Sequence, residues 1–216
     1  MKIGLLIPTF NRPEYLVQCL EFVLKSNCSH ELVILIIDDK STDKLTINLI
    51  QKFEHPSFEV NKMFLLKNRG IAGVLRIGFN FLFGLGCQYV VNLDSDAIVK
   101  PNFIDVLVGL KTEFPDKIIS GFNTQSVDPK TMKPRHQTIE QHADYCIKKT
   151  IGGINMLISE TDYTQTVLPA LTKPGHWDWN VCVRVFNFIV STPSVVQHIG
   201  IRSGMNMNNP DIALDF

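Results

Sequence analysis

Two carboxylates one residue apart, Asp94 and Asp96, directly follow an apolar run from Tyr89 to Leu93 that is interrupted only by Asn92. A short run rich in β-branched and aromatic residues is typical of a buried strand. Two like charges at its end need compensation by a cation or by hydrogen-bond donors. Mg²⁺ and Mn²⁺ commonly use one or two carboxylates together with substrate phosphates. The stretch therefore predicts a metal–diphosphate site, although Asp-Ser-Asp is also ordinary turn chemistry and the context must decide.

The first half of the chain alternates strand and helix signals. This alternation implies a mostly parallel sheet with helices on its faces. Polar residues collect just after each apolar run, at the edge where open α/β sheets bind ligands. The expected strands are residues 3–8, 32–37, 63–66 and 89–93, and the expected helices are 13–24, 41–53 and 68–83.

The second half is less regular. Residues 125–142 are polar with two prolines, so we expect a loop or an irregular hairpin there. The tail after Ser203 lacks periodicity and is expected to be loose. The remaining predicted elements are helices over 101–114, 161–171 and 177–187, a strand over 118–122, and a turn that leads into a strand over 151–158.

The composition is that of an ordinary globular protein, with 45% hydrophobic and 19% charged residues. A formal net charge of zero argues against a nucleic-acid binder. The five cysteines are scattered without a Cys-x-x-Cys pair, as expected for reduced thiols. We see no signal peptide and no apolar stretch long enough for a bilayer, and expect a soluble, cytoplasmic protein. Without repeats or a clear linker, we expect one domain over residues 1–216, divided into a nucleotide-binding half (1–100) and an acceptor and catalytic half (101–216).

Four motifs follow one another along the chain: Thr9-Phe10-Asn11-Arg12-Pro13, Asp38-Asp39-Lys40-Ser41-Thr42-Asp43, Asn68-x-Gly70-x-Ala72-Gly73 and Asp94-Ser95-Asp96. In this order and at these spacings, the chain resembles the GT-A fold, family 2 glycosyltransferases, including rhamnosyltransferase-like members. The resemblance extends to about His198. It implies an α/β GT-A (Rossmann-like) fold and an enzyme that transfers a sugar from a nucleoside-diphosphate donor.

At matching positions, the resemblance implies that the first two strand ends hold the nucleotide. Thr9 would contact the base, with Asn11 and Arg12 beside it in the donor site. Asp39 would accept the imide hydrogen of uracil. The structural alternative is that Asp38 and Asp39 only cap the following helix, and we assign that capping to Ser41 or Asp43 instead.

The resemblance also places glycines next to the donor. Asn68 and Gly70 would shape the turn where backbone passes close to the nucleotide, and Gly153 would let backbone approach the donor sugar. Arg76, on the helix that follows Gly70, would reach the base or the phosphates. A solvated or ion-paired arginine is the alternative.

The same resemblance divides the roles around the acidic pair. Asp94, with Ser95, corresponds to the position that meets the ribose or the donor sugar, and Asp96 to the one that coordinates Mn²⁺ or Mg²⁺. His198, within a Val-x-His-x-Gly element, is a candidate further metal ligand or else a structural histidine. Arg202 would steady the diphosphate from a closing loop.

A catalytic base must be supplied separately, because inverting displacement at the anomeric carbon needs a carboxylate near the acceptor hydroxyl. The family's late Glu-Asp-x-Asp-x-x-x-Arg element corresponds here to residues 177–184, in which Asp178 matches the presumed base and Arg184 the arginine. Trp177 replaces the Glu and Asn180 the second Asp, so the element departs from the pattern. The alternative role of Asp178 is a charge that stabilises a helix N-terminus.

The resemblance thus implies an inverting, metal-dependent glycosyltransferase that uses a nucleoside-diphosphate sugar and a glycan or glycoprotein acceptor. We expect a UDP-sugar as the donor, with GDP- and dTDP-sugars as the alternatives. We expect neither a nucleic-acid partner nor a transmembrane segment, and the chain fits one module of a larger multidomain polypeptide. Two alternatives remain: a haloacid-dehalogenase-like phosphatase, which also places Asp-x-Asp after a strand, and a non-catalytic glycan-binding relative. Intact Asp94, Asp96 and Asp178 argue against the latter.

Overall fold

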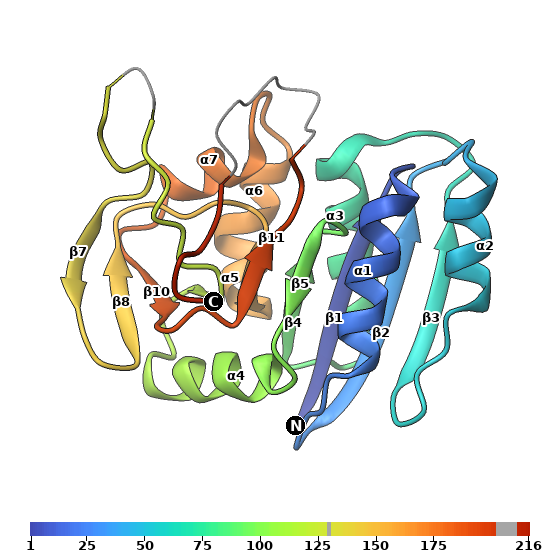
Figure 1. The fold of residues 1–216 in the computed structure, drawn as a ribbon, viewed down its shortest axis with the longest axis horizontal. Coiled ribbons are helices and arrows are strands. Elements are labelled where there is room, and N and C mark those ends of the chain that lie inside the picture. Colours follow the sequence, from blue (N-terminus) through green and yellow to red (C-terminus); the bar gives the residue numbers. More distant parts are fainter. Residues whose placement is uncertain (129–130, 202–210) are drawn as a thin grey trace.

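A computed structural model describes residues 1–128, 131–201 and 211–216. The strands of its central sheet are β1 (Lys2–Thr9), β2 (Glu31–Asp38), β3 (Glu59–Phe64), β4 (Tyr89–Leu93), β6 (Ile119–Ser120), β7 (Thr138–Gln141), β8 (Tyr145–Lys148), β9 (Asn155–Ser159) and β10 (Phe188–Ser191). Within the described residues they form a nine-stranded sheet in the order β3-β2-β1-β4-β9-β6-β10-β8-β7 (Figure 1). The long ladders that join β3, β2, β1 and β4 are parallel, and antiparallel pairing begins at β9.

Helices cover both faces of this sheet. On one face α1, α2 and α4 contribute Leu16, Ile50 and Phe103 to one core cluster. On the other face α3 and α7 contribute Phe79 and Trp177 to a second cluster. The predicted α/β fold, with a mostly parallel sheet flanked by helices, is confirmed. The helices are α1 (Pro13–Leu24), α2 (Lys44–Lys52), α3 (Gly70–Gly84), α4 (Phe103–Glu113), α5 (Glu160–Asp162), α6 (Leu168–Leu171) and α7 (Trp177–Cys182), with a π-helical turn, Tyr163–Val167, between α5 and α6.

The first half follows the predicted order of elements closely, with one displaced strand. The third strand is Glu59–Phe64 rather than residues 63–66. It lies at the edge of the sheet, where β2 is its one partner among the described strands, so half of its residues are polar and none is fully buried. Leu66, at 93% exposure, lies beyond the strand. The apolar run that gave the prediction therefore marked the end of the strand and the loop after it.

The second half holds the larger corrections. The helix predicted over 177–187 ends at Cys182, and Asn187 takes a left-handed conformation with a φ of 67°. Phe188 then starts β10, a strand buried between β6 and β8 rather than the continuation of a helix. Of the loop or irregular hairpin expected for residues 125–142, the structure has one arm of an irregular hairpin, β7. Its other arm, β8, lies beyond this range and pairs with β7 across a register shift.

Two short strands, β5 (Ala97–Val99) and β11 (Val196–His198), were not predicted and form a separate antiparallel pair. The tail prediction is wrong for residues 211–216, which dock on the domain. Ala213 and Gln197 exchange two hydrogen bonds, and Asp215 accepts one from Ser194. Polar groups in this tail form hydrogen bonds with the rest of the domain. Hydrophobic periodicity in the sequence does not predict such bonds. The rest of the tail, and Arg202 just before it, lie outside the described residues.

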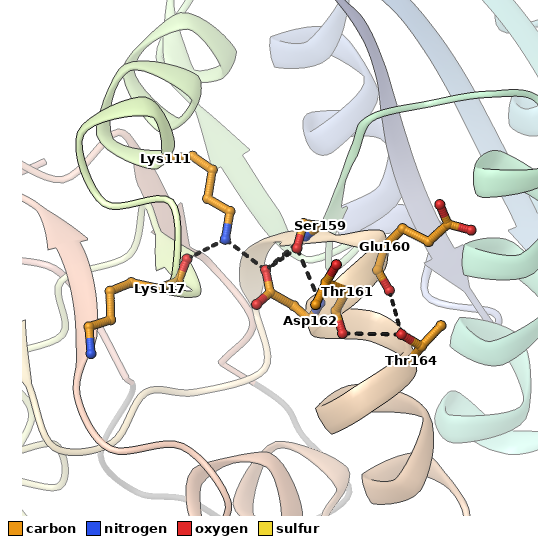
Figure 2. Close-up of polar contacts among 7 residues, drawn as sticks. All are labelled: Lys111, Lys117, Ser159, Glu160, Thr161, Asp162 and Thr164. Carbon is orange, nitrogen blue, oxygen red and sulfur yellow. Dashed lines mark hydrogen bonds and ion pairs between the residues drawn. The ribbon is translucent and has the colours of Figure 1, made fainter.

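A buried ion pair fixes α4 to the start of α5 (Figure 2). The ammonium of Lys111, whose side chain is 1% exposed, lies 2.7 Å from Asp162 Oδ2 and also donates to the Lys117 carbonyl. The same Oδ2 accepts from the backbone N–H and the hydroxyl of Ser159, which caps α5 in return. The charged atoms of this pair therefore have hydrogen-bond partners although they lie away from water.

The five cysteine thiols are free, and four of them are buried. Across the part of the chain that the structure describes, none of the helices has the length and apolar character needed to cross a bilayer.

Candidate functional site

A cavity of about 440 Å³ opens at the carboxyl ends of β1, β2 and β4. Parallel strands bring their carboxyl ends to one edge of the sheet, so residues far apart in sequence meet there. Several predicted site residues do not line this cavity: Asn11, Arg76, Gly153, Asp178 and His198. The predicted donor-site residues that line it are Thr9, Arg12, Asp39, Asn68, Gly70, Asp94, Ser95 and Asp96.

Asp39 fixes the loop that enters α3. Its two carboxylate oxygens accept the backbone N–H groups of Arg69 at 2.6 Å and Gly70 at 2.8 Å. The Asn68 amide donates to the Asp39 carbonyl at 3.1 Å. Gly70 has a φ of 68°, a conformation that glycine adopts without a Cβ clash. Asp39 thus shapes one wall of the cavity, and its carboxylate keeps lone pairs for a base N–H, so the base-binding role stays a prediction.

Asn11 ties two loops together rather than lining the cavity. Its backbone N–H donates to the Ser41 hydroxyl at 2.7 Å, and its side-chain oxygen accepts from the N–H groups of Thr42 and Asp43. Asp43 caps α2 by accepting from the Thr46 N–H at 2.7 Å, which confirms the predicted cap. The loop from β1 to α1 is thereby held against the loop from β2 to α2.

Thr9 and Arg12 lie at the cavity end of that same loop. The Thr9 hydroxyl is buried and has no hydrogen-bond partner among the described residues, so it is available to a ligand. Asn11 and Arg12 both have left-handed backbone conformations, with φ of 53° and 64°. Two successive non-glycine residues in this region cost free energy and need support from their surroundings. The Asn11 hydrogen bonds supply that support.

Asp96 stands in a cluster of charged groups. Its Oδ2 lies 2.9 Å from Nη2 of Arg12 and 3.3 Å from Nε2 of His198. Burial raises the pKa of the Asp96 carboxyl, but the hydrogen bond and charge of His198 and the charge of Arg12 outweigh burial and hold that pKa below its usual value. Burial likewise lowers the pKa of His198, and its contacts with Asp96 and Asp211 more than reverse the effect.

Asp94 experiences the opposite environment. Burial, followed by the negative charges of Asp96 and Asp178, raises the pKa of the Asp94 carboxyl well above its usual value, and Arg12 only partly opposes this. A site with three carboxylates this close attracts a cation. The electrostatic effect of Asp178 on Asp94 also indicates that the presumed base lies next to the cavity.

Asp178 is positioned from the other half of the chain. It lies in the first turn of α7, where Oδ2 accepts the Gly153 N–H at 3.1 Å and Oδ1 accepts the Trp179 N–H at 2.8 Å. A Cβ on Gly153 would lie 2.6 Å from the ring of Trp177, so glycine is needed for this close approach. Trp177 is buried, while Trp179 is 58% exposed. Trp177 therefore packs in the core, and Trp179 is the tryptophan available to a sugar.

Arg76 is not brought to the site. The residue is exposed on α3, and its carbonyl accepts a hydrogen bond from the hydroxyl of Tyr163. This exposure fits the solvated alternative, and contact of Arg76 with the base or the phosphates stays a prediction.

Two features beside Asp96 escaped the sequence reasoning. Gly200 was not singled out as a site residue, yet a Cβ there would lie 2.3 Å from Asp96 Oδ2 and 2.7 Å from His198 Nε2. The Val-x-His-x-Gly element contained this signal. No sequence pattern marked the Asp211 carbonyl, which lies 3.2 Å from Nδ1 of His198.

A divalent metal can be tested against these donors. Across the described parts of the chain, no group of three or more His, Cys, Asp and Glu side chains is arranged to hold a metal ion. Two predicted ligand atoms do lie together, Asp96 Oδ2 and His198 Nε2 at 3.3 Å. The Asp211 carbonyl fixes His198 by its other ring nitrogen, as outer partners of metal-bound histidines do. This pair suits a metal whose remaining ligands are water and substrate phosphates.

Comparison with known proteins finds similarity to glycosyltransferases. The family model for glycosyl transferase family 2 matches residues 5–164. The chain is 30% identical over 105 residues to "Glycosyltransferase GlyG" of Streptococcus pneumoniae, covering 49% of this chain and 33% of the relative. It is 31% identical over 109 residues to an undecaprenyl-phosphate 4-deoxy-4-formamido-L-arabinose transferase of Photorhabdus laumondii, covering 50% and 33%. The matched segments thus span about a third of the length of these curated relatives.

Solved structures share the fold at low sequence identity. GalNAc-T7 in complex with UDP, GalNAc and Mn²⁺ aligns with a TM-score of 0.69 at 14% identity, covering 91% of this chain and 43% of that one. S. aureus TarS 1–349 in complex with UDP-GlcNAc aligns with a TM-score of 0.62 at 15% identity, covering 94% and 62%. The family match includes Asp94 and Asp96 but ends before Asp178 and His198. Because that match extends over most of the sequence, the chain belongs to glycosyl transferase family 2.

Proposed function

We propose that this chain is an inverting glycosyltransferase that moves a sugar from a UDP-sugar to a hydroxyl group of a glycan or glycoprotein, with Mn²⁺ or Mg²⁺. The observation that carries this proposal is the cavity at the strand ends, where Thr9, Asp39, Arg12 and the acidic pair line one space. Membership of a glycosyltransferase family sets the phosphatase alternative aside. Similar folds that bind UDP, as in the complex of GalNAc-T7, support the choice of donor.

The two halves of the chain divide the work in this proposal. Residues 1–100 hold the nucleotide, with Asp39 and Thr9 at the base and Arg12 at the diphosphate. Residues 101–216 supply Asp178 and the Gly153 turn for the sugar and the acceptor. We place both halves in one domain, because the central sheet runs through β4 and β9 without a break.

Asp96 and His198 are the residues that would hold the metal. A bound Mn²⁺ or Mg²⁺ supplies positive charge that offsets the negative charge developing on the departing nucleotide. The negative charges of Asp96 and Asp178 both act on the Asp94 carboxyl. In this position Asp94 would hydrogen-bond the ribose or the donor sugar. The raised pKa of Asp94 indicates that additional positive charge beside it would favour its ionised form.

Asp178 takes the proton from the acceptor hydroxyl. The hydroxyl oxygen forms a bond to the anomeric carbon as the bond from that carbon to the diphosphate breaks, which inverts the configuration. Gly153 and Trp179 each donate a backbone N–H to the Asp178 carboxylate, so its orientation is fixed before the substrate arrives. Each oxygen still has a lone pair for the acceptor proton.

Calorimetric titration of UDP, GDP and dTDP, each with Mn²⁺ and with a chelator, tests the donor half. We expect binding of UDP that depends on the metal. If none of the three nucleotides binds under either condition, the proposal is wrong.

The base is tested by Asp178→Asn, with the exposed Asp116→Asn as a control for loss of one carboxylate. We expect UDP affinity close to that of the unaltered protein in both variants. Release of UDP from a UDP-sugar that the unaltered protein turns over should be lost only in Asp178→Asn. Turnover retained in Asp178→Asn would remove this residue from the mechanism.

A further inference from the structure

Arg12 occupies the carboxylate oxygen that the proposed metal would use. Its Nη2 lies 2.9 Å from Asp96 Oδ2, the same atom that His198 Nε2 approaches at 3.3 Å. Gly200 closes a further side, since a Cβ there would lie 2.3 Å from this oxygen. A cation that binds Asp96 Oδ2 together with His198 therefore meets the Arg12 guanidinium first.

The contact of Arg12 with Asp96 is an ion pair without directional hydrogen bonds. Nε and Nη2 of Arg12 are buried, and neither has a hydrogen-bond partner of correct geometry among the described residues. The guanidinium stacks over the ring of Tyr15, with 4.6 Å between its carbon and the ring centroid. Buried donors without acceptors are costly, so this guanidinium gains by meeting a ligand rich in acceptor oxygens.

The backbone is strained in a way that keeps Arg12 in this place. Asn11 and Arg12 both adopt left-handed conformations, and the Asn11 side chain is bound to the N–H groups of Thr42 and Asp43. Strain of this kind is maintained where the surrounding structure requires it. Its effect here is to direct the arginine that precedes α1 toward Asp96.

Charge in the cavity makes an exchange favourable. Among the described residues that line the cavity, Arg12 is the one Lys or Arg, and it shares the space with three carboxylates, Asp39, Asp94 and Asp96. A nucleoside diphosphate adds further negative charge and presents several oxygens in a geometry that guanidinium groups bind well. A metal that arrives with the diphosphate can replace Arg12 on Asp96, while Arg12 moves its donors to the phosphate oxygens.

We propose that Arg12 is the resident cation of Asp96 in the donor-free protein and makes metal binding depend on the nucleotide donor. This inference rests on the proposed function of the same site. Without nucleotide, the guanidinium competes with the metal for Oδ2 of Asp96. With nucleotide, the guanidinium has a better partner, so the metal and the diphosphate strengthen each other's binding, and linkage makes this coupling reciprocal.

The test is a titration of Mn²⁺, followed by electron paramagnetic resonance, with and without saturating UDP. The proteins are the unaltered chain, Arg12→Gln, Arg12→Lys and, as a control for loss of one remote positive charge, the exposed Lys44→Gln on α2. Without UDP, we expect Arg12→Gln to bind Mn²⁺ about tenfold more tightly than the unaltered protein, because removing a charged partner frees the carboxylate. Arg12→Lys and Lys44→Gln should stay within about twofold of it.

With UDP, the difference in Mn²⁺ affinity between the proteins should change. UDP should increase the Mn²⁺ affinity of the unaltered protein strongly and that of Arg12→Gln much less, because the variant has no guanidinium to transfer to the diphosphate. A thermal unfolding transition shared by all four proteins excludes misfolding as the cause.

Two results would overturn the inference, and they are distinguishable. If the unaltered protein binds Mn²⁺ with UDP but Arg12→Gln binds donor-free Mn²⁺ no more tightly, Arg12 does not compete and only the inference is wrong. If no protein binds Mn²⁺ even with UDP, both the inference and the metal-dependent function are wrong.

Discussion

The ion pair between Lys111 and Asp162 allows a stringent test of how the second half of the fold is held together. The side chains of Lys111 and Asp162 are 1% and 15% exposed, and their charged atoms lie 2.7 Å apart. Removing one partner of such a pair leaves a buried charge without compensation, at a cost of about 3–5 kcal/mol. We therefore expect Asp162→Asn to lower the free energy of unfolding by that amount.

The choice of asparagine isolates the charge. Asparagine keeps an oxygen that can accept from the N–H and hydroxyl of Ser159, so the cap of α5 is retained in large part. For a chain of this size, each kcal/mol lowers the melting temperature by about 2–4 °C. The expected fall is therefore roughly 6–20 °C. The double variant Lys111→Met/Asp162→Asn removes the buried charge altogether and should be more stable than Asp162→Asn alone.

Urea unfolding of Asp162→Asn, Lys111→Met and the double variant measures the coupling energy between the two side chains. Glu54→Gln provides the control, because the Glu54–Lys62 pair has a similar distance of 2.6 Å while the Glu54 side chain is 77% exposed. This exposed pair should contribute no more than about 1 kcal/mol. If Asp162→Asn costs as little as Glu54→Gln, or if the double variant is the least stable of all, burial does not make this charge pair costly to break and the argument is wrong.

Two further predictions concern the site and the pH dependence of stability. Gly200→Ala places a Cβ against Asp96 and His198 and should weaken Mn²⁺-dependent UDP binding roughly tenfold in calorimetry. Gly109→Ala, where a Cβ meets nothing within 4 Å, should leave it unchanged, and equal affinities would contradict the role given to the cluster. Burial lowers the pKa of Lys148 in the folded chain below its ordinary value of 10.5. The folded state therefore favours the neutral amine, and the contribution of Lys148 to stability is full above pH 10.5. It is lost as pH falls from 10.5 toward the lowered pKa. Urea unfolding at several pH values should show the unaltered protein gaining stability relative to Lys148→Met as pH rises toward 10.5, and a difference independent of pH would refute the shift.

The first half of the fold was predictable because local pattern and final environment agree there. The strands β1 and β2 are buried on both faces, and such strands are continuous apolar runs. The second half lacks this agreement. Val181, Val185 and Phe188 have helical spacing in the sequence, yet Asn187 turns left-handed and Phe188 enters a strand whose neighbours come from distant parts of the chain. Strand partners that are distant in sequence cannot be predicted from the pattern of neighbouring residues.

The site was predictable to the extent that it depends on strand ends. Thr9, Asp39 and Asp94 lie at or just after the ends of buried parallel strands, and all of them line the cavity. Arg76 and Asn11 were placed there as well, but they depend on finer features. The rotation of α3 leaves Arg76 exposed, and the left-handed backbone at Asn11 turns that residue to the loop before α2. Neither the rotation of α3 nor the left-handed backbone at Asn11 can be predicted from the residue types alone.

One polar residue in the buried strand β4 explains how the two halves of the site are brought together. Asn92 is fully buried, donates to the Gly153 carbonyl at 2.7 Å, and its own carbonyl accepts from the Asn155 side chain at 3.0 Å. These bonds cross the antiparallel pair of β4 and β9, in which Leu93 is opposite Asn155. Because side chains alternate across a strand, a slip of β9 by one residue against β4 would turn Asn155 to the wrong face and break these bonds.

The register that Asn92 and Asn155 fix has a consequence for the chemistry. Antiparallel pairing places the start of β9 beside the end of β4, so the Gly153 turn lies next to Asp94. Asp178 is bound to the Gly153 N–H and is thereby carried to the cavity, although it comes from the other half of the sequence. The asparagine that interrupts the apolar run is thus the residue that aligns the proposed base with the proposed donor site.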